Sequence, residues 1–235
     1  MPIRLVANLS DSVTSRADKF LAWNFLKPLQ KEFCDDLLGD STELLQWLEE
    51  QNDGRLRGKR VRCFALDFDS LYDSLDQSLV LEAVRAAFSE CDCADSWSDD
   101  NVNWICELIE LSLSSSVAKF GDNWYRALNG IPTGNSISVM LANITVFYVL
   151  RKVIYSAEVR PPELISLRRF VDDIGGCGMD LPEHSRYWLM LSIDSWRVNM
   201  VCPLKRIVTR LGTLVNRVSL PLLLMSGLSL MVRRV

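Results

Sequence analysis

Two adjacent acids, Asp172 and Asp173, lie in the second half of the chain, where residues 170–176 are otherwise apolar residues and glycines. This pattern predicts two strands joined by a tight turn that carries both carboxylates. Neighbouring like charges repel each other, and a divalent cation removes the repulsion because hard cations take carboxylate oxygens as ligands. The pair therefore predicts a metal site, and the alternative is an acidic turn that only faces solvent.

A third acid, Asp67, stands near the end of the β-rich run at residues 61–68. If this strand pairs with the hairpin, Asp67 and Asp172 converge at one edge of a sheet. Two such acids, with a backbone carbonyl such as that of Phe68, can hold two Mg²⁺ ions about 3.5–4 Å apart and promote an in-line phosphoryl transfer. The sequence does not choose between these acids and two nearby alternatives, Asp69 and Asp73.

Helices and loops must position these acids. Apolar spacing predicts helices at residues 15–33, 40–48, 75–88, 104–120 and about 137–155, with loops at residues 51–59, 90–103 and 129–136. Pro28 is expected to kink or split the first helix, and either Ser41 or Asp40 to cap the second. The order of strand, helices and hairpin indicates an α+β fold, a split βαβ arrangement whose antiparallel sheet is backed by helices.

The charge of the chain is unevenly distributed. Its 235 residues, 49% of them apolar and 24% charged, are typical of one large or two small globular domains. Residues 195–235 carry seven basic residues and no acid, so residues 1–194 hold 19 basic against 30 acidic residues, a net charge of −11. Such an acidic body is not typical of a general nucleic-acid binder, and metal ions or further segments must supply positive charge if nucleic acid binds.

The cysteines and the apolar segments indicate in which part of the cell the protein is expected. The seven cysteines lack a paired CxxC arrangement and no secretory signal begins the chain, so we expect reduced thiols in an intracellular protein, nuclear or cytoplasmic and not secreted. Cys91 and Cys93, with His184 remote in sequence, are too sparse for zinc. The apolar run at residues 218–232 is shorter than the roughly 20 residues of a spanning helix, which predicts no membrane role.

Three segments together resemble, in order, polymerase motifs A, B and C of reverse transcriptases. They are Asp67-Phe68-Asp69-Ser70-Leu71-Tyr72, residues 130–136 with Leu141-Ala142-Asn143, and Phe170-Val171-Asp172-Asp173. The Ser-Leu-Tyr and Leu-Ala-Asn tripeptides, and the sequences of residues 25–29 and 40–45, are most similar to the Penelope-like retroelement branch. The resemblance covers about residues 2–176, and its specificity comes from three motifs in the right order.

The resemblance implies a polymerase palm with partial helical fingers. Residues 1–60 would be partial fingers, residues 61–180 the palm with all three motifs, and residues 181–235 a degraded or incomplete connection from palm to thumb. Asp67 and Asp172 would be the principal metal ligands, aided by the carbonyl of Phe68, with Asp173 as an accessory acid. The substrate-binding residues would be Phe68, the sugar gate Tyr72, and the loop residues Gly130, Pro132, Thr133 and Gly134.

The implied activity is RNA-directed DNA polymerisation by a retroelement enzyme. A primer 3′-hydroxyl would attack a dNTP with the help of two Mg²⁺ ions, for which Mn²⁺ is a substitute, and the partners would be an RNA template, a DNA primer and the dNTP. The oligomeric state is open. Two alternatives remain, an inactive palm remnant that at most binds nucleic acid and a viral RNA-dependent RNA polymerase. Tyr72 disfavours the RNA polymerase, because an enzyme that uses NTP needs a polar group to meet the 2′-hydroxyl. The next residue, Asp73, is such a polar group and keeps this alternative open.

The ends of the sequence depart from the family pattern. The family has a basic fingers segment upstream that ends in an Arg-Pro-Ile-like step, and Met1-Pro2-Ile3 begins inside this step, so we expect a fragment in which Arg4 substitutes weakly for triphosphate-binding cations. The resemblance fades after Gly178. Lys205 is the best candidate for the motif D lysine, and residues 210–212 for a remnant of the primer grip.

Overall fold

The computed structural model describes residues 12–53, 61–68, 71–91, 97–120, 123–126, 129–153, 164–179 and 204–205. The chain divides into two compact units, each built from separated segments. The helical unit comprises Met1–Leu37, Phe68–Arg160 and Leu189–Leu204, and the sheet unit comprises Leu38–Asp67, Pro161–Trp188 and Lys205–Val235. The domain boundaries inferred from the sequence stay a prediction.

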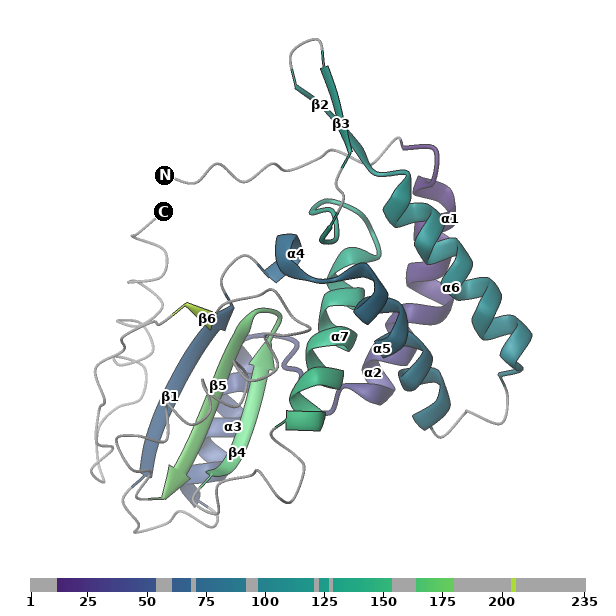
Figure 1. Cartoon of the computed structure of the whole chain (residues 1–235). Coiled ribbons are helices and arrows are strands. Elements are labelled where there is room, and N and C mark those ends of the chain that lie inside the picture. The colour runs from purple at the N-terminus through teal and green to yellow at the C-terminus, as the bar shows by residue number, and fades with distance from the viewer. Residues whose placement is uncertain are drawn as a thin grey trace. The chain divides into compact units, whose positions relative to one another are not determined.

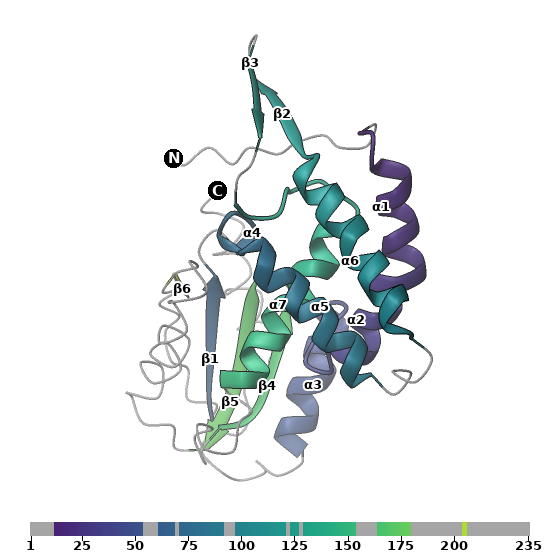
Figure 2. The same ribbon diagram turned by 45° about the vertical axis from the view of Figure 1, so that its right-hand side comes forward.

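The helical unit is organised around one apolar helix, α7. Its elements are α1 (Ser15–Leu21), η1 (Ala22–Leu26), α2 (Lys27–Phe33), α4 (Leu71–Ser74), α5 (Gln77–Glu90), α6 (Asp99–Ser114), β2 (Val117–Phe120), β3 (Asn123–Arg126) and α7 (Ser138–Val153). Helices α2, α4 and α5 pack against α7, in which residues 141–150 are all buried, and α1 lies beside α6 (Figure 1, Figure 2). The predicted helix at about 137–155 is thereby confirmed as the core of this unit.

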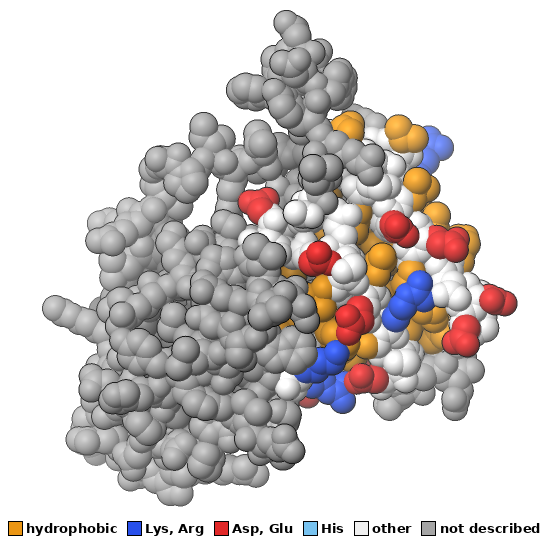
Figure 3. Space-filling model, in the orientation of Figure 1, with side chains coloured by type: hydrophobic (Ala, Val, Ile, Leu, Met, Phe, Trp, Pro, Cys, Tyr) orange, Lys and Arg blue, Asp and Glu red, His pale blue; other side chains and the backbone are white. Residues whose placement is uncertain are grey.

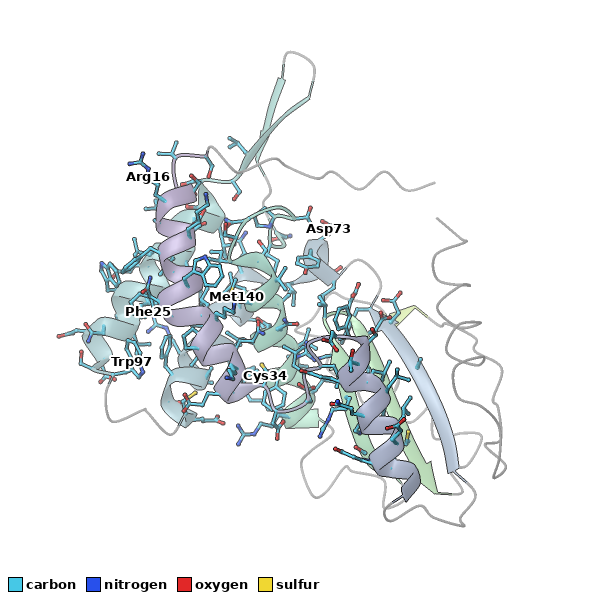
Figure 4. All side chains as sticks on the ribbon, turned by 180° about the vertical axis from the view of Figure 1, so that it is seen from behind. Arg16, Phe25, Cys34, Asp73, Trp97 and Met140 are labelled. Atoms are coloured by element: carbon cyan, nitrogen blue, oxygen red, sulfur yellow. The ribbon has the colours of Figure 1, made fainter. Side chains whose placement is uncertain are left out.

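Pro28 changes the geometry of the first predicted helix without ending it. The turn before it, η1, is π-helical, and Pro28 is the second residue of α2. A proline has no backbone N–H to donate and its ring crowds the preceding turn, so a wider turn relieves the conflict. Figure 4 shows Phe25 of η1 beside Trp97, and their rings meet edge to face with centroids 5.6 Å apart.

The prediction of a helix at residues 104–120 is wrong at both ends. Helix α6 starts at Asp99, where Ser98 Oγ accepts a hydrogen bond from the Asn101 N–H, so part of the predicted loop at residues 90–103 is helical. The helix ends at Ser114, and the chain continues into the β2–β3 hairpin. Serine hydroxyls compete for helical carbonyls, and here Ser116 Oγ donates to the Ser112 carbonyl at 3.0 Å.

In the described part of the sheet unit, the helix is α3 (Ser41–Asp53) and the main strands are β1 (Val61–Phe68, within this unit up to Asp67), β4 (Leu164–Phe170) and β5 (Asp173–Met179). The sheet order is β4-β5-β1-β6, where β6 is Leu204–Lys205, and β5 pairs antiparallel with both β4 and β1. This confirms the predicted hairpin and its pairing with the earlier strand.

Helix α3 is fixed at its start and along its length. Asp40 is its cap, because the backbone N–H groups of Thr42 and Glu43 donate to Asp40 Oδ1 at 2.7 and 3.0 Å. Along the helix, the indole Nε1 of Trp47 donates to Ser166 Oγ of β4 at 2.8 Å. The Trp47 contact attaches α3 to the sheet, and Figure 1 shows this helix behind the strands.

Several predicted features lie outside the described residues, namely Asp69, His184, residues 210–212 and the apolar run at residues 218–232. Within the described ranges, none of the helices combines the length and apolar character needed to cross a bilayer.

Candidate active site

Three acids from two distant segments meet at one end of the sheet unit. The antiparallel register of β1 and β5 places Asp67 directly opposite Asp173. Asp172 lies in the turn that precedes β5, so it is adjacent to this pair along the chain. The predicted convergence of the strand end and the hairpin is therefore present in the backbone register. Asp73, one of the alternative acids, belongs to the helical unit and is exposed on α4 (Figure 4).

The charges of Asp172 and Asp67 act on the carboxyl group of Asp173. The pKa of Asp173 rises from its usual 3.8 to about 6, first because the group is partly buried and then because Asp172 and Asp67 bring negative charge near it. Clustered carboxylate oxygens with unfavourable mutual charge are the donor set that hard divalent cations prefer. In the described ranges, however, no group of three or more His, Cys, Asp or Glu side chains is placed to hold a metal ion. The metal ligands therefore stay a prediction, with which the chemistry of these carboxylates is compatible.

The raised pKa of Asp173 predicts a pH dependence of stability in the absence of divalent cations. The folded protein holds the Asp173 proton more tightly than the unfolded chain, so this contribution to stability is complete below about pH 4 and is lost as the pH rises through about 6. Thermal unfolding in EDTA should show the decline, and Asp173→Asn should flatten it. Because bound metal displaces the proton, added Mg²⁺ should stabilise the wild type more at about pH 7 than at about pH 5. Identical profiles for wild type and variant would contradict the electrostatic coupling.

The predicted nucleotide loop, residues 129–136, is attached to α4 and to the start of α5 in the helical unit. The Ile131 N–H donates to the Tyr72 carbonyl at 2.8 Å, and Gln77 Nε2 donates to the Gly130 carbonyl at 2.9 Å. Gly130 has φ +79°, and a Cβ at this position would lie 2.7 Å from the Tyr72 carbonyl oxygen. A glycine is therefore required where the loop meets the backbone of the predicted sugar gate.

The far end of this loop is fixed by buried polar groups. Asn135 Nδ2 donates to Ser112 Oγ of α6 at 2.9 Å, and Ser138 Oγ donates to the Pro132 carbonyl at 2.6 Å. Between these anchors, Pro132 and Thr133 are half-buried and Gly134 is exposed. Of the predicted substrate-binding residues of this loop, Pro132, Thr133 and Gly134 are therefore accessible, whereas Gly130 is buried.

Residues 141–143, part of the second motif, belong to the core. Leu141 and Ala142 are fully buried, and Asn143 Nδ2 donates to Gln30 Oε1 of α2 at 3.2 Å. The Asn143 carbonyl also accepts a hydrogen bond from the Cys34 thiol at 3.6 Å. These residues fix α7 against α2.

The structure groups the predicted site residues into two sets. Asp67, Asp172 and Asp173 belong to the sheet unit, whereas Tyr72 and the loop residues Gly130, Pro132, Thr133 and Gly134 belong to the helical unit. Phe68 follows Asp67 directly, is 2% exposed, and is assigned to the helical unit. Sequence reasoning missed Gln77, which holds the loop, because a glutamine 53 residues before its partner leaves no local signal.

Comparisons with known proteins identify the fold. No protein-family model and no curated protein matches the sequence. Among solved structures, the chain is similar to telomerase from Candida albicans in complex with a TWJ fragment of telomeric RNA, with a TM-score of 0.61 and 15% identity over 89% of this chain and 36% of that chain. It is also similar to telomerase from Candida tropicalis, in complex with such a fragment (0.61; 14%; 90% and 35%) and as a truncated apo form (0.56; 13%; 86% and 43%).

The chain therefore spans about 35–43% of the length of these telomerase chains. At identities of 13–15% the likeness concerns the fold. Helices with a small antiparallel sheet confirm the predicted α+β class, and the likeness shows that the chain shares its fold with part of these telomerases.

Proposed function

We propose that this chain is the fingers–palm part of an RNA-directed DNA polymerase of a retroelement, from the Penelope-like branch. The observation that carries the proposal is the register of β1 and β5, which brings the acids of motifs A and C to one end of a sheet. The polymerase fold supports the class of enzyme, and the Ser-Leu-Tyr and Leu-Ala-Asn steps support the branch. Two of the similar telomerase structures contain RNA, which supports RNA as a partner.

The acids divide the work of nucleotidyl transfer. Asp67 and Asp172, with the Phe68 carbonyl, would hold two divalent cations, and Asp173 would supply further negative charge. Bound Mg²⁺ supplies Lewis acidity toward the attacking 3′-hydroxyl and the departing pyrophosphate. Asp173 is half-buried, and the charge of a partly buried carboxylate acts more strongly on its neighbours than it would in bulk water.

The loop and α4 would select the nucleotide. Tyr72 is half-buried and its backbone carbonyl accepts the Ile131 N–H, which supports a role in which its ring would lie beneath the sugar of a dNTP. Tyr72→Ala is expected to relax discrimination between dNTP and NTP more than it lowers dNTP use, because a smaller side chain leaves room for the 2′-hydroxyl. Single-nucleotide incorporation with each substrate measures the ratio. An unchanged ratio would refute the gate.

Surface charge favours one alternative, an inactive remnant that at most binds nucleic acid. Helix α6 carries the exposed acids Asp99, Asp100, Glu107 and Glu110 and no basic residue, and acids are spread over the face of the helical unit that Figure 3 shows. Such a face repels phosphates, so template and primer would have to bind elsewhere. An active enzyme overcomes this repulsion through its bound cations, whereas a remnant does not.

Primer extension on an RNA template separates these functions. The proposal predicts incorporation of dNTP in the presence of Mg²⁺ or Mn²⁺ and its loss with EDTA. Incorporation of NTP in preference to dNTP would identify an RNA polymerase instead. No incorporation with either substrate, even with Mn²⁺ and high protein concentration, would favour the inactive remnant.

A further inference from the structure

The turn that carries Asp172 has an unusual backbone conformation. Val171 has φ +52°, and it is the one non-glycine residue with a positive φ among the described parts of the chain. A β-branched side chain is strongly disfavoured in this left-handed region. Such a conformation persists only where the surroundings hold it, and residues held in this way are concentrated at functional sites.

A buried arginine holds this turn. The side chain of Arg169, in β4, is 0% exposed, and its Nη1 donates to the Val171 carbonyl at 3.0 Å. The backbone carbonyl of Arg169 accepts a hydrogen bond from the Leu38 N–H at 2.8 Å, and this bond holds the backbone of β4 at Arg169. Burying a guanidinium costs free energy unless its N–H groups donate hydrogen bonds. The buried position of Arg169 next to the turn therefore calls for a physical reason.

We propose that Arg169 is a positioning residue that holds the Val171 peptide in its left-handed form and so presents Asp172 and Asp173 at the end of the sheet. The Val171 carbonyl belongs to the peptide that begins Asp172, so fixing its oxygen fixes where the Asp172 side chain starts. The inference rests on the proposed function, in which these acids bind divalent cations.

The chemistry of arginine suits this task better than that of lysine. A guanidinium is planar, keeps its charge when buried and presents several donors in fixed directions, whereas an ammonium is a compact charge on a flexible stem. Without the hydrogen bond, Val171 would relax toward a negative φ and turn the following peptide. The carboxylates would then be misdirected although the sheet remained paired, because a site needs support from the residues around it.

A pair of substitutions tests this mechanism. Arg169→Lys is expected to weaken Mn²⁺ binding, followed by electron paramagnetic resonance, about 10- to 100-fold, the loss typical of removing a supporting group. Val171→Gly should bind Mn²⁺ nearly as the wild type does, because glycine adopts positive φ without strain. In the double variant, Val171→Gly should restore most of the affinity. Loss of a purely structural arginine would not be rescued by this glycine.

Arg168→Lys is the matched control, since the neighbouring Arg168 is half-buried and donates to the adjacent Leu167 carbonyl at 3.2 Å rather than to the turn residue Val171. It should leave Mn²⁺ affinity unchanged. If Arg169→Lys does not fold by circular dichroism, the double variant decides: wild-type affinity supports the mechanism, and weak binding or misfolding overturns it. A folded Arg169→Lys with unchanged affinity also overturns it. If the wild type itself binds no Mn²⁺, the proposed function fails, and the positioning role with it.

Discussion

Asp172→Asn is expected to lower the rate of primer extension by about 10³-fold or more, since removing a single preorganised electrostatic group typically costs 10²–10³-fold and this group would also be a metal ligand. Asp172 lies in a turn and is only half-buried, so an isosteric amide should leave the sheet and its unfolding temperature unchanged. The measurement is single-nucleotide incorporation at saturating Mg²⁺, with circular dichroism to confirm the fold.

Two further variants make this result specific. Asp67→Asn should cause a comparable loss, because its strand position faces Asp173 across the register. Asp99→Asn removes an exposed acid at the start of α6 and should keep the wild-type rate. If Asp172→Asn extends primers as fast as the control does, Asp172 is not a catalytic acid.

Gly130→Ala is expected to lower the free energy of unfolding by about 2–5 kcal/mol, the sum of a left-handed backbone and a steric conflict. The added Cβ would meet the backbone of Tyr72 and Asp73 at 2.7–2.9 Å, closer than real Cβ contacts. These neighbours are backbone atoms, which cannot move aside as a flexible side chain can. Urea denaturation followed by circular dichroism measures the loss.

Gly175→Ala is the control for this stability experiment. Its Cβ would meet only the Arg168 carbonyl oxygen, at an ordinary 3.8 Å, so little destabilisation is expected. If Gly130→Ala were as stable as this control, the loop would not be held against α4 in the way the structure describes.

The local pattern of apolar residues is sufficient to predict the hairpin and its partner strand. Apolar residues around Asp172 and Asp173 indicated two strands, and the β-rich run that carries Asp67 indicated a third. The antiparallel pairing of this run with the hairpin followed from the fold class. Asp40 was one of two caps that the sequence allowed, and its contacts with Thr42 and Glu43 settle the choice.

Other features depend on contacts that local spacing does not encode. Strand β2 falls within the helix predicted at residues 104–120, because Val117 and Phe120 continue the apolar spacing of α6 and the serines that end the helix give too weak a signal. The left-handed Val171 was not predicted, because valine disfavours that conformation and Arg169 holds it from within the same unit.

Titration of the wild type and of an Asp67→Asn, Asp172→Asn double variant with Mn²⁺, followed by electron paramagnetic resonance, asks whether these acids bind divalent cations. The measurement requires neither template nor primer, so it isolates the proposed metal-binding acids. We expect saturable Mn²⁺ binding by the wild type, displaced by Mg²⁺, and its loss in the folded double variant. Equal binding by both proteins, or no binding by the wild type, would contradict this expectation.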